Sequence, residues 1–256
     1  MIIAPKSKLL KQRQGNAPTI VQILPAMVRG GVERGTVEMA DAIQKHGGRA
    51  IVISRGGPMV RHLDRLGATH YQLDVHTKNP FRWPQVRRRL KAILSRENAD
   101  LVHVRSRVPA WIALPAAAEL GIATVSTVHG RFITPSALKR IYNRKLLKTD
   151  HVIAISNYVK DLITSQYVDV KERLTVVHRG VDIDLFNPDN VNQTRIVNFV
   201  EGLAIPDDVP VIMLPARATK WKGHQILLQA LAKIKDRAFI CLMIGAGDGK
   251  PAFVSE

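Results

Sequence analysis

The residues best suited to chemistry lie in the turn that follows the short apolar run Val211 to Leu214. This turn carries two cations, Arg217 and Lys222, and the amphipathic segment Gln225 to Ile234 comes directly after it. An arginine offers a planar fork of donors to phosphate oxygens, a lysine offers a mobile point charge, and a helix N-terminus also attracts anions. The pair could be ordinary solvated charges, but its position between a strand and a helix favours phosphate binding.

A glycine-rich segment, Gly245-Ala246-Gly247-Asp248-Gly249, follows the next apolar run, Phe239 to Ile244. We expect Gly245 and Gly247 to contribute to the same phosphate-binding edge. The segment does not match a dinucleotide-binding fingerprint, because that motif opens a helix inside a βαβ unit and only seven residues follow Gly249.

The overall charge predicts an anionic partner. The chain has 256 residues and a formal net charge of +17, and 46% of its residues are hydrophobic, which is enough for a substantial core. Nucleic acid, acidic phospholipid and a phosphorylated substrate all fit this charge. The aromatic content of 5% argues against binding of single-stranded nucleic acid, which requires rings that stack on bases.

The sequence also argues against a disulfide framework, a metal site and a membrane-spanning segment. The only cysteine, Cys241, lies in an apolar run, so it reads as a buried strand residue rather than part of a disulfide framework. The histidines and carboxylates show no metal-ligand spacing, so we expect no metal site. No apolar run reaches the length of a membrane span. We therefore expect a cytoplasmic protein, with peripheral contact to the inner face of a membrane left open.

Elsewhere the pattern alternates between strand-like apolar runs and amphipathic helices, as in a doubly wound α/β sheet. We expect a basic flexible tail at 1–16, a complete Rossmann-like domain at 17–190, and a linker with the start of a second Rossmann-like domain at 191–256. The inter-domain connection should lie between about Asn187 and Pro210. The expected strands are 19–24, 49–54, 69–73, 100–104, 122–128, 151–155, 173–177, 211–214 and 239–244.

Within the first domain, two kinds of residue follow strands and could form a site. Gly30 and Gly31 come after the first strand, where glycine allows close approach of a ligand and positive φ, although a simple tight turn is the alternative. His103 and His129 lie near the ends of later strands, where open α/β sheets bind ligands, although hydrogen-bonded core histidines are the alternative.

Two basic helical segments, one that opens at Asn79-Pro80 and one at Ala137 to Lys148, are most simply solvated faces. The sharper hypothesis is that Arg82 to Lys91 and Ala137 to Lys148 dock the first domain on anionic phospholipid.

Several short pieces of the sequence carry one resemblance when they are taken together in chain order. They are Gly30 to Arg34, Asp100 to Arg107, Thr127 to Gly130, Ala154 to Val159, Val177 to Asp182 with Phe186 and Pro188, Arg217, and Lys222-Gly223. Together they resemble the retaining glycosyltransferases of family four, which have the GT-B architecture of two Rossmann-like domains. The residues of the Arg105-Ser106-Arg107 and Trp221-Lys222-Gly223 pieces look most like those of bacterial enzymes that build lipopolysaccharide or related surface glycans.

The resemblance implies transfer of a sugar from a nucleoside-diphosphate sugar to a glycan or lipid-linked acceptor, with retention of configuration. No cofactor or metal is implied, because cationic side chains and helix N-termini stabilise the departing diphosphate. By the family pattern, His129 is the catalytic candidate beside the transferred sugar. The donor-binding candidates are Gly30, Gly31, Asp182, Arg217, Lys222, Gly245 and Gly247. The candidates on the acceptor side are His103, Arg105 and Arg107.

The sequence also departs from the family pattern. Ala216 and Ala218 replace the glycine and leucine expected around Arg217. The pattern normally continues past the position of Gly249 into further βαβ units and a glutamate pair. We therefore expect a truncated or split-gene glycosyltransferase. The alternative function is an inactive remnant, or one half of a split enzyme, that acts as a basic acceptor-binding or membrane-binding module beside a complementing C-terminal chain.

Overall fold

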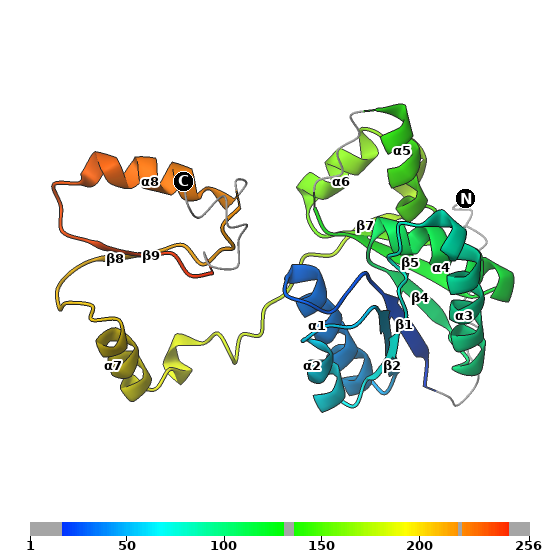
Figure 1. Ribbon diagram of the computed structural model, residues 1–256, viewed down its shortest axis with the longest axis horizontal. Coiled ribbons are helices and arrows are strands. Elements are labelled where there is room, and N and C mark those ends of the chain that lie inside the picture. Colours follow the sequence, from blue (N-terminus) through cyan, green and yellow to red (C-terminus); the bar gives the residue numbers. More distant parts are fainter. Residues whose placement is uncertain (1–16, 131–135, 220–221, 246–256) are drawn as a thin grey trace, which may run out of the picture. The chain divides into compact units, whose positions relative to one another are not determined.

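The computed structural model describes residues 17–130, 136–219 and 222–245. The chain divides into two compact units, Met1–Gly180 and Val181–Glu256 (Figure 1). This division precedes the domain boundary that the sequence suggested near residue 190. The tail expected at 1–16 and the candidate Gly247 lie outside the described residues.

The first unit is built on a seven-stranded parallel sheet in the order β3-β2-β1-β4-β5-β6-β7. All seven expected strands form, and the α/β prediction is confirmed. The continuous apolar runs identify them because a parallel strand in this setting is covered on both faces. The strands are β1 (Thr19–Ile23), β2 (Arg49–Ser54), β3 (Thr69–Gln72), β4 (Leu101–Val104), β5 (Ala123–Val128), β6 (His151–Ala154) and β7 (Leu174–Val176).

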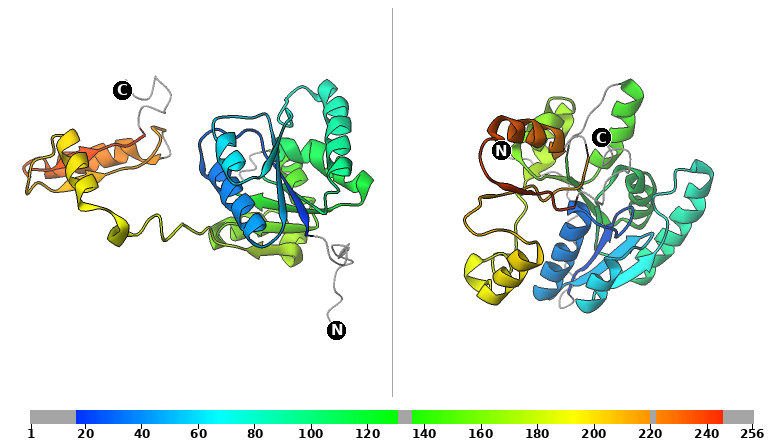
Figure 2. Two further views of the ribbon diagram at one scale, coloured as in Figure 1. Left: turned by 90° about the horizontal axis from the view of Figure 1, so that it is seen from below. Right: turned by 60° about the vertical axis from the view of Figure 1, so that its left-hand side comes forward.

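Helices cover both faces of this sheet (Figure 2). One core contains Leu90, Leu94 and Ile112 from the helices on one face, and the other contains Ala40 and Leu63 from the helices on the opposite face. Strand β2 supplies alternate residues to the two cores, as its period of two requires. The helices are α1 (Gly31–Lys45), α2 (Val60–Arg65), α3 (Trp83–Arg96), α4 (Arg107–Leu120), α5 (Ala137–Arg144) and α6 (Asn157–Thr164).

Backbone hydrogen bonds tie the loop after β1 to the loop after β2. The amide of Met27 donates to the carbonyl of Gly56 over 2.9 Å, and the amide of Met59 donates to the carbonyl of Met27 over 2.8 Å. Gly57 between them has φ +142°, and a Cβ there would lie 2.4 Å from the Met27 oxygen. Only glycine fits this close approach, which fixes the chain just before α1 begins.

The second unit contains a two-stranded parallel sheet of β8 (Val211–Met213) and β9 (Ile240–Leu242), joined through α8 (His224–Leu231). It also contains α7 (Gln193–Gly202), a helix in a stretch that the sequence assigned to the inter-domain connection. The sequence analysis missed α7, although Ile196, Val197 and Phe199 lie in it, and none of its residues is buried. The side chain of Asn192 nevertheless caps it by accepting from the amide of Thr194 over 2.7 Å.

The two basic segments pack differently from each other. The first forms a 3₁₀ turn, Pro80–Arg82, and the expected helix, α3, in which Leu90 and Leu94 are buried. The second breaks into α5 and a 3₁₀ turn, Lys145–Leu147. Its apolar residues do not share one buried face, because Leu146 is buried whereas Leu138 and Ile141 are exposed. Across the described residues, no helix combines the length and apolar character needed to cross a bilayer.

Candidate functional site

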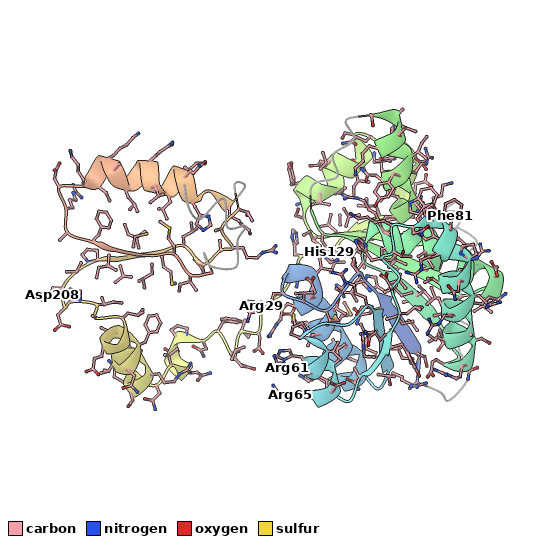
Figure 3. All side chains as sticks on the ribbon, in the orientation of Figure 1. Arg29, Arg61, Arg65, Phe81, His129 and Asp208 are labelled. Carbon is pink, nitrogen blue, oxygen red and sulfur yellow. The ribbon has the colours of Figure 1, made fainter. Side chains whose placement is uncertain are left out.

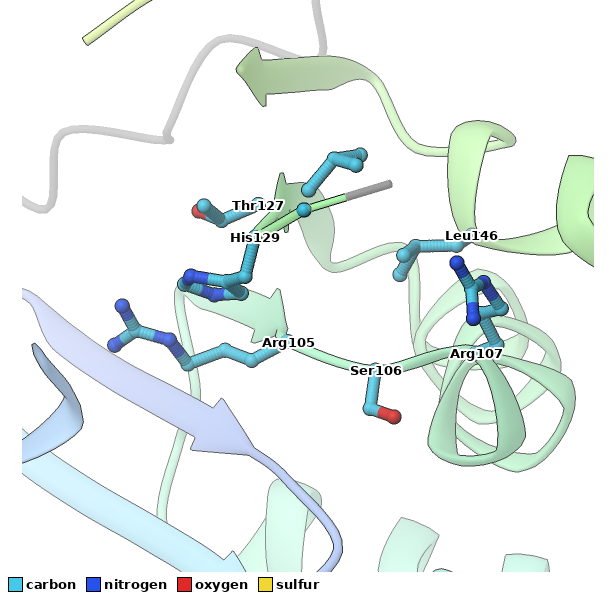
Figure 4. A pocket seen from close by; sticks show the side chains of 8 residues that line it. Arg105, Ser106, Arg107, Thr127, His129 and Leu146 are labelled. Carbon is cyan, nitrogen blue, oxygen red and sulfur yellow. The ribbon is translucent and has the colours of Figure 1, made fainter. Parts of the chain in front are cut away.

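A pocket of about 180 Å³ opens where β4 and β5 end (Figure 4). The first residues after β4 and the start of α4 form one wall, and the end of β5 with the next two residues forms the other. Parallel strands place their carboxyl ends at one edge of the sheet, which is where open α/β folds bind ligands. The pocket is lined by Arg105, Ser106, Arg107, Thr127, Val128, His129, Gly130 and Leu146.

His129 offers its imidazole to this pocket in the neutral form. Neither ring nitrogen has a hydrogen-bond partner among the described residues, although both nitrogens are shielded from solvent. Burial, followed by the positive charges of Arg105 and Arg179, lowers the pKa of His129 to about 3. At neutral pH the ring can therefore donate one hydrogen bond and accept another, which suits a sugar hydroxyl.

Arg105 is held in place by groups from two elements, β1 and α1. Its Nη1 donates to the Gln22 side-chain oxygen on β1 and, over 3.0 Å, to the Gly35 carbonyl on α1. Burial, with a further contribution from Arg179, lowers the pKa of Arg105 to about 10, so the guanidinium stays charged at neutral pH. This arginine therefore supplies a fixed positive charge at the sheet edge. Figure 4 shows its guanidinium beneath the His129 ring.

The other two acceptor-side candidates occupy different places. Arg107 begins α4 and lines the pocket, and burial lowers its pKa. His103 lies within β4 and does not line the pocket. Its Nε2 makes a 2.8 Å hydrogen bond with the Thr127 hydroxyl, and burial holds its pKa well below the ordinary value. We infer that His103 supports the pocket wall through Thr127.

The structure does not require left-handed backbone at the two glycines that begin α1. Gly30 has extended backbone (φ 160°, ψ 171°), and Gly31 also lies outside the left-handed region. A Cβ on Gly30 would meet the flexible end of Glu33 at 2.6 Å, and one on Gly31 would make only an ordinary contact with Arg179. A Cβ on Gly35 would lie 2.5 Å from the Arg179 guanidinium, so Arg179 would have to shift.

Arg179 therefore joins the end of the first unit to α1. Its guanidinium donates to the Gly31 carbonyl and to the Glu38 carboxylate, the latter over 3.2 Å. Arg179 lies within the matching piece Val177 to Asp182, but it was not among the predicted site residues. Gly35, Gln22 and Glu38 were not predicted either. These residues carry no local signal, because their partners lie far away in the chain.

In the second unit, the turns after β8 and β9 lie side by side. The amide of Ala216 donates to the Ile244 carbonyl over 2.9 Å, and a Cβ on Gly245, which has φ +88°, would lie 3.2 Å from the Ala216 oxygen. Arg217 is exposed in the first of these turns. The structure thus brings Arg217 and Gly245 to the same edge of this small sheet.

Lys222 and Asp182 complete the described candidates of the second unit. Lys222 is exposed just before α8, and its amide donates to the Thr219 carbonyl over 2.9 Å. Gly223 follows with φ +82° as the residue before the helix. Asp182 accepts from the amide of Leu185 over 3.0 Å, which gives its carboxylate a role in the local turn. No cluster of three metal-ligating side chains occurs among the residues described here.

Comparison with known proteins places this chain in a family. The sequence profile of Glycosyltransferase Family 4 matches residues 29–185, more than half of the chain. The chain belongs to this family. The match begins before the Gly30-Gly31 turn and includes the pocket residues and Arg179, whereas Arg217, Lys222 and Gly245 lie outside the matched region.

Two curated relatives are similar in sequence to this chain. The spore coat protein SA of Bacillus subtilis is 23% identical over 223 residues, which cover 86% of this chain and 57% of that protein. The alpha-monoglucosyldiacylglycerol synthase of Streptococcus pneumoniae is 26% identical over 167 residues, which cover 59% of this chain and 36% of the synthase.

Two solved structures share the architecture. A glycosyltransferase from Rickettsia africae superposes with a TM-score of 0.83 at 38% identity, over 94% of this chain and 63% of that one. HepE from Anabaena, in complex with UDP and glucose, gives a TM-score of 0.73 at 18% identity, over 92% of this chain and 63% of HepE. The latter likeness concerns the fold alone. Together they confirm the GT-B type of α/β architecture, of which this chain spans less than two thirds.

Proposed function

We propose that the chain acts in a glycosyltransferase that takes a sugar from a nucleoside-diphosphate sugar and retains its anomeric configuration. The observation that carries the proposal is the pocket at the edge of β4 and β5, with a neutral His129 whose ring nitrogens have no partner among the described residues. The named complex of HepE with UDP and glucose supports a donor of this class.

The reaction breaks the bond between the anomeric carbon and the diphosphate oxygen, and it forms a bond to the acceptor oxygen. The proton of the acceptor hydroxyl passes to the departing diphosphate. We assign to Arg217 and Lys222 the stabilisation of the negative charge on that diphosphate. His129 orients a hydroxyl of the transferred sugar. Arg105 and Arg107, with Ser106 between them, face the acceptor.

The biological setting is a finer part of the same proposal. The Arg105-Ser106-Arg107 motif and the basic first unit favour a glycan or lipid-linked acceptor in surface polysaccharide or lipopolysaccharide assembly at the cytoplasmic face of a membrane. Radiolabelled sugar transfer to lipid extracts of glycan-deficient cells tests this assignment. Label that enters only water-soluble products would contradict a lipid-linked acceptor.

Calorimetry with UDP and a panel of nucleotide-sugars tests the donor. Lys222→Ala should weaken nucleotide binding by about tenfold, because it removes one charge-assisted contact to phosphate. Lys233→Ala, at an exposed lysine of the same unit, is the matched control and should bind normally. His129→Asn should leave UDP affinity unchanged and lower the rate of sugar transfer. If no nucleotide or nucleotide-sugar gave a measurable heat of binding, the proposal would be wrong.

A second candidate function is a binding module that holds acceptor without donor, beside a complementing chain. The exposed apolar residues of the second unit favour it, since Val211, Met213, Ile226 and Leu228 are all exposed. The same calorimetry discriminates the two functions. Acceptor binding without nucleotide binding would support the module.

A further inference from the structure

Three large apolar side chains stand exposed at one edge of the first unit. Phe81, in the 3₁₀ turn before α3, is 91% exposed, and Leu138 and Ile141 of α5 are 80% and 61% exposed. Figure 3 labels Phe81 at the start of α3. A single exposed leucine is common on proteins, but a phenylalanine and two aliphatic residues exposed to this extent in two neighbouring elements indicate a contact surface.

Trp111 of α4 contacts the elements that directly follow the exposed residues. The ring of Trp83, the first residue of α3, lies 5.9 Å from the Trp111 ring, and the ammonium of Lys145, the first residue of the 3₁₀ turn after α5, lies 5.5 Å above it. The 3₁₀ turn with Phe81 follows β3, and α5 follows β5, so both begin at the carboxyl edge of the sheet. The exposed residues therefore border the same edge as the pocket.

The surface around them is strongly basic. Residues 75–96 contain seven cations and residues 136–148 contain five, and neither segment contains a carboxylate. Some of these cations pair with neighbouring elements: Lys91 and Arg87 with Glu119, and Arg144 with Asp169. Lys78, Arg82, Lys139 and Lys148 form no ion pair with a carboxylate among the described residues.

We propose that this surface, formed by residues 78–82 and α5, docks the protein on an anionic phospholipid bilayer. Phe81, Leu138 and Ile141 enter the boundary between headgroups and acyl chains, while the basic side chains contact headgroup phosphates. The combination favours a membrane over a protein partner, because long basic side chains keep their charges in the headgroup region while apolar neighbours insert. The inference rests on the proposed function in one respect: it places the pocket beside a lipid-linked acceptor.

Sedimentation with vesicles of phosphatidylglycerol and phosphatidylethanolamine tests the inference, with phosphatidylcholine vesicles as the neutral comparison. The full chain should bind the anionic vesicles and lose binding as salt rises. Leu138→Ser/Ile141→Ser should lower the vesicle partition coefficient by about tenfold or more, since two inserting side chains are lost. Both positions are exposed, so the fold should persist, and thermal unfolding checks this.

The matched control is Ile226→Ser/Leu228→Ser, which removes an isoleucine and a leucine that are 71% and 53% exposed on α8. It should bind vesicles like the parent. A second variant, Lys139→Glu/Lys148→Glu, should lose anionic binding, whereas Lys233→Glu/Lys235→Glu should keep it.

Equal binding to neutral and anionic vesicles, no binding at all, or equal loss in both double-serine variants would overturn the inference. Calorimetry with UDP in the absence of vesicles separates this result from the donor proposal. Nucleotide binding without vesicle binding defeats only the docking surface. Vesicle binding without nucleotide binding defeats only the donor assignment.

Discussion

The two units differ in how completely they cover the faces of their β-sheets. The first covers both faces of a seven-stranded sheet and buries its helices in two cores. Among its described residues the second forms a sheet of two strands, and in β8 both Val211 and Met213 are exposed. A sheet needs several strands and a covered face for independent stability. The pocket around His129 is therefore supported by a well-packed sheet, whereas the turn of Arg217 follows a sheet with little buried surface.

A pair of leucine substitutions gives the largest expected contrast. Leu90→Ala on α3 removes a side chain that is fully buried, and it should lower the free energy of unfolding by about 2–5 kcal/mol. Leu228→Ala on α8 removes a side chain that is 53% exposed, and it should cost less than about 1 kcal/mol. Chemical denaturation followed by circular dichroism measures both. Equal losses of stability would mean that α8 is covered in solution, and they would contradict the difference in packing between the two units.

Substitution of one glycine in each unit compares how closely the backbone is packed. Gly57→Ala places a Cβ against the Met27 carbonyl at positive φ, so we expect a loss of about 3 kcal/mol. Gly223→Ala also meets positive φ, but no described atom lies within 4 Å of its Cβ, so we expect about 1 kcal/mol. Thermal unfolding of both variants checks the difference. A smaller effect at Gly57 would show that the loop before α1 is looser than described.

The buried imidazole of His129 predicts a pH dependence of the first unit. In the folded chain its pKa is about 3, whereas in the unfolded chain it is near 6.5. Below pH 6.5 the unfolded state therefore binds a proton that the folded state does not, and stability falls by about 1.4 kcal/mol per pH unit. Between pH 7 and 5 the parent should lose about 2 kcal/mol more than His129→Asn.

Denaturation curves of the two proteins at pH 7, 6 and 5 measure this difference. His103, whose pKa is also held low by burial, contributes to the pH dependence of both proteins and cancels in the comparison. Parallel curves would show that the His129 ring is more hydrated than its burial indicates. That outcome would weaken the assignment of His129 to a water-poor pocket.

The strands and most helices could be predicted because their signals are local. An apolar run such as Thr19 to Leu24 predicts a buried strand without knowledge of its neighbours. The pieces that resemble family four are also short stretches of consecutive residues, so they can be recognised without knowledge of the fold. In contrast, α7 follows the turn-forming residues Asn187 to Asn190, which indicated a linker, and none of its residues is buried. The exposure of Leu138 and Ile141 could not be predicted, because helical spacing shows which residues share a face and not what covers that face.

By itself, the sequence determined the α/β alternation, the position of His129 after a strand and the resemblance to family 4. Only the tertiary structure decided how the site is held. Arg105 reaches Gln22 across 83 residues, and Arg179 reaches Gly31 across 148. The pKa of His129 follows from burial and from these two arginines. Burial and charge act through space, so they depend on contacts that form only when distant parts of the chain pack together.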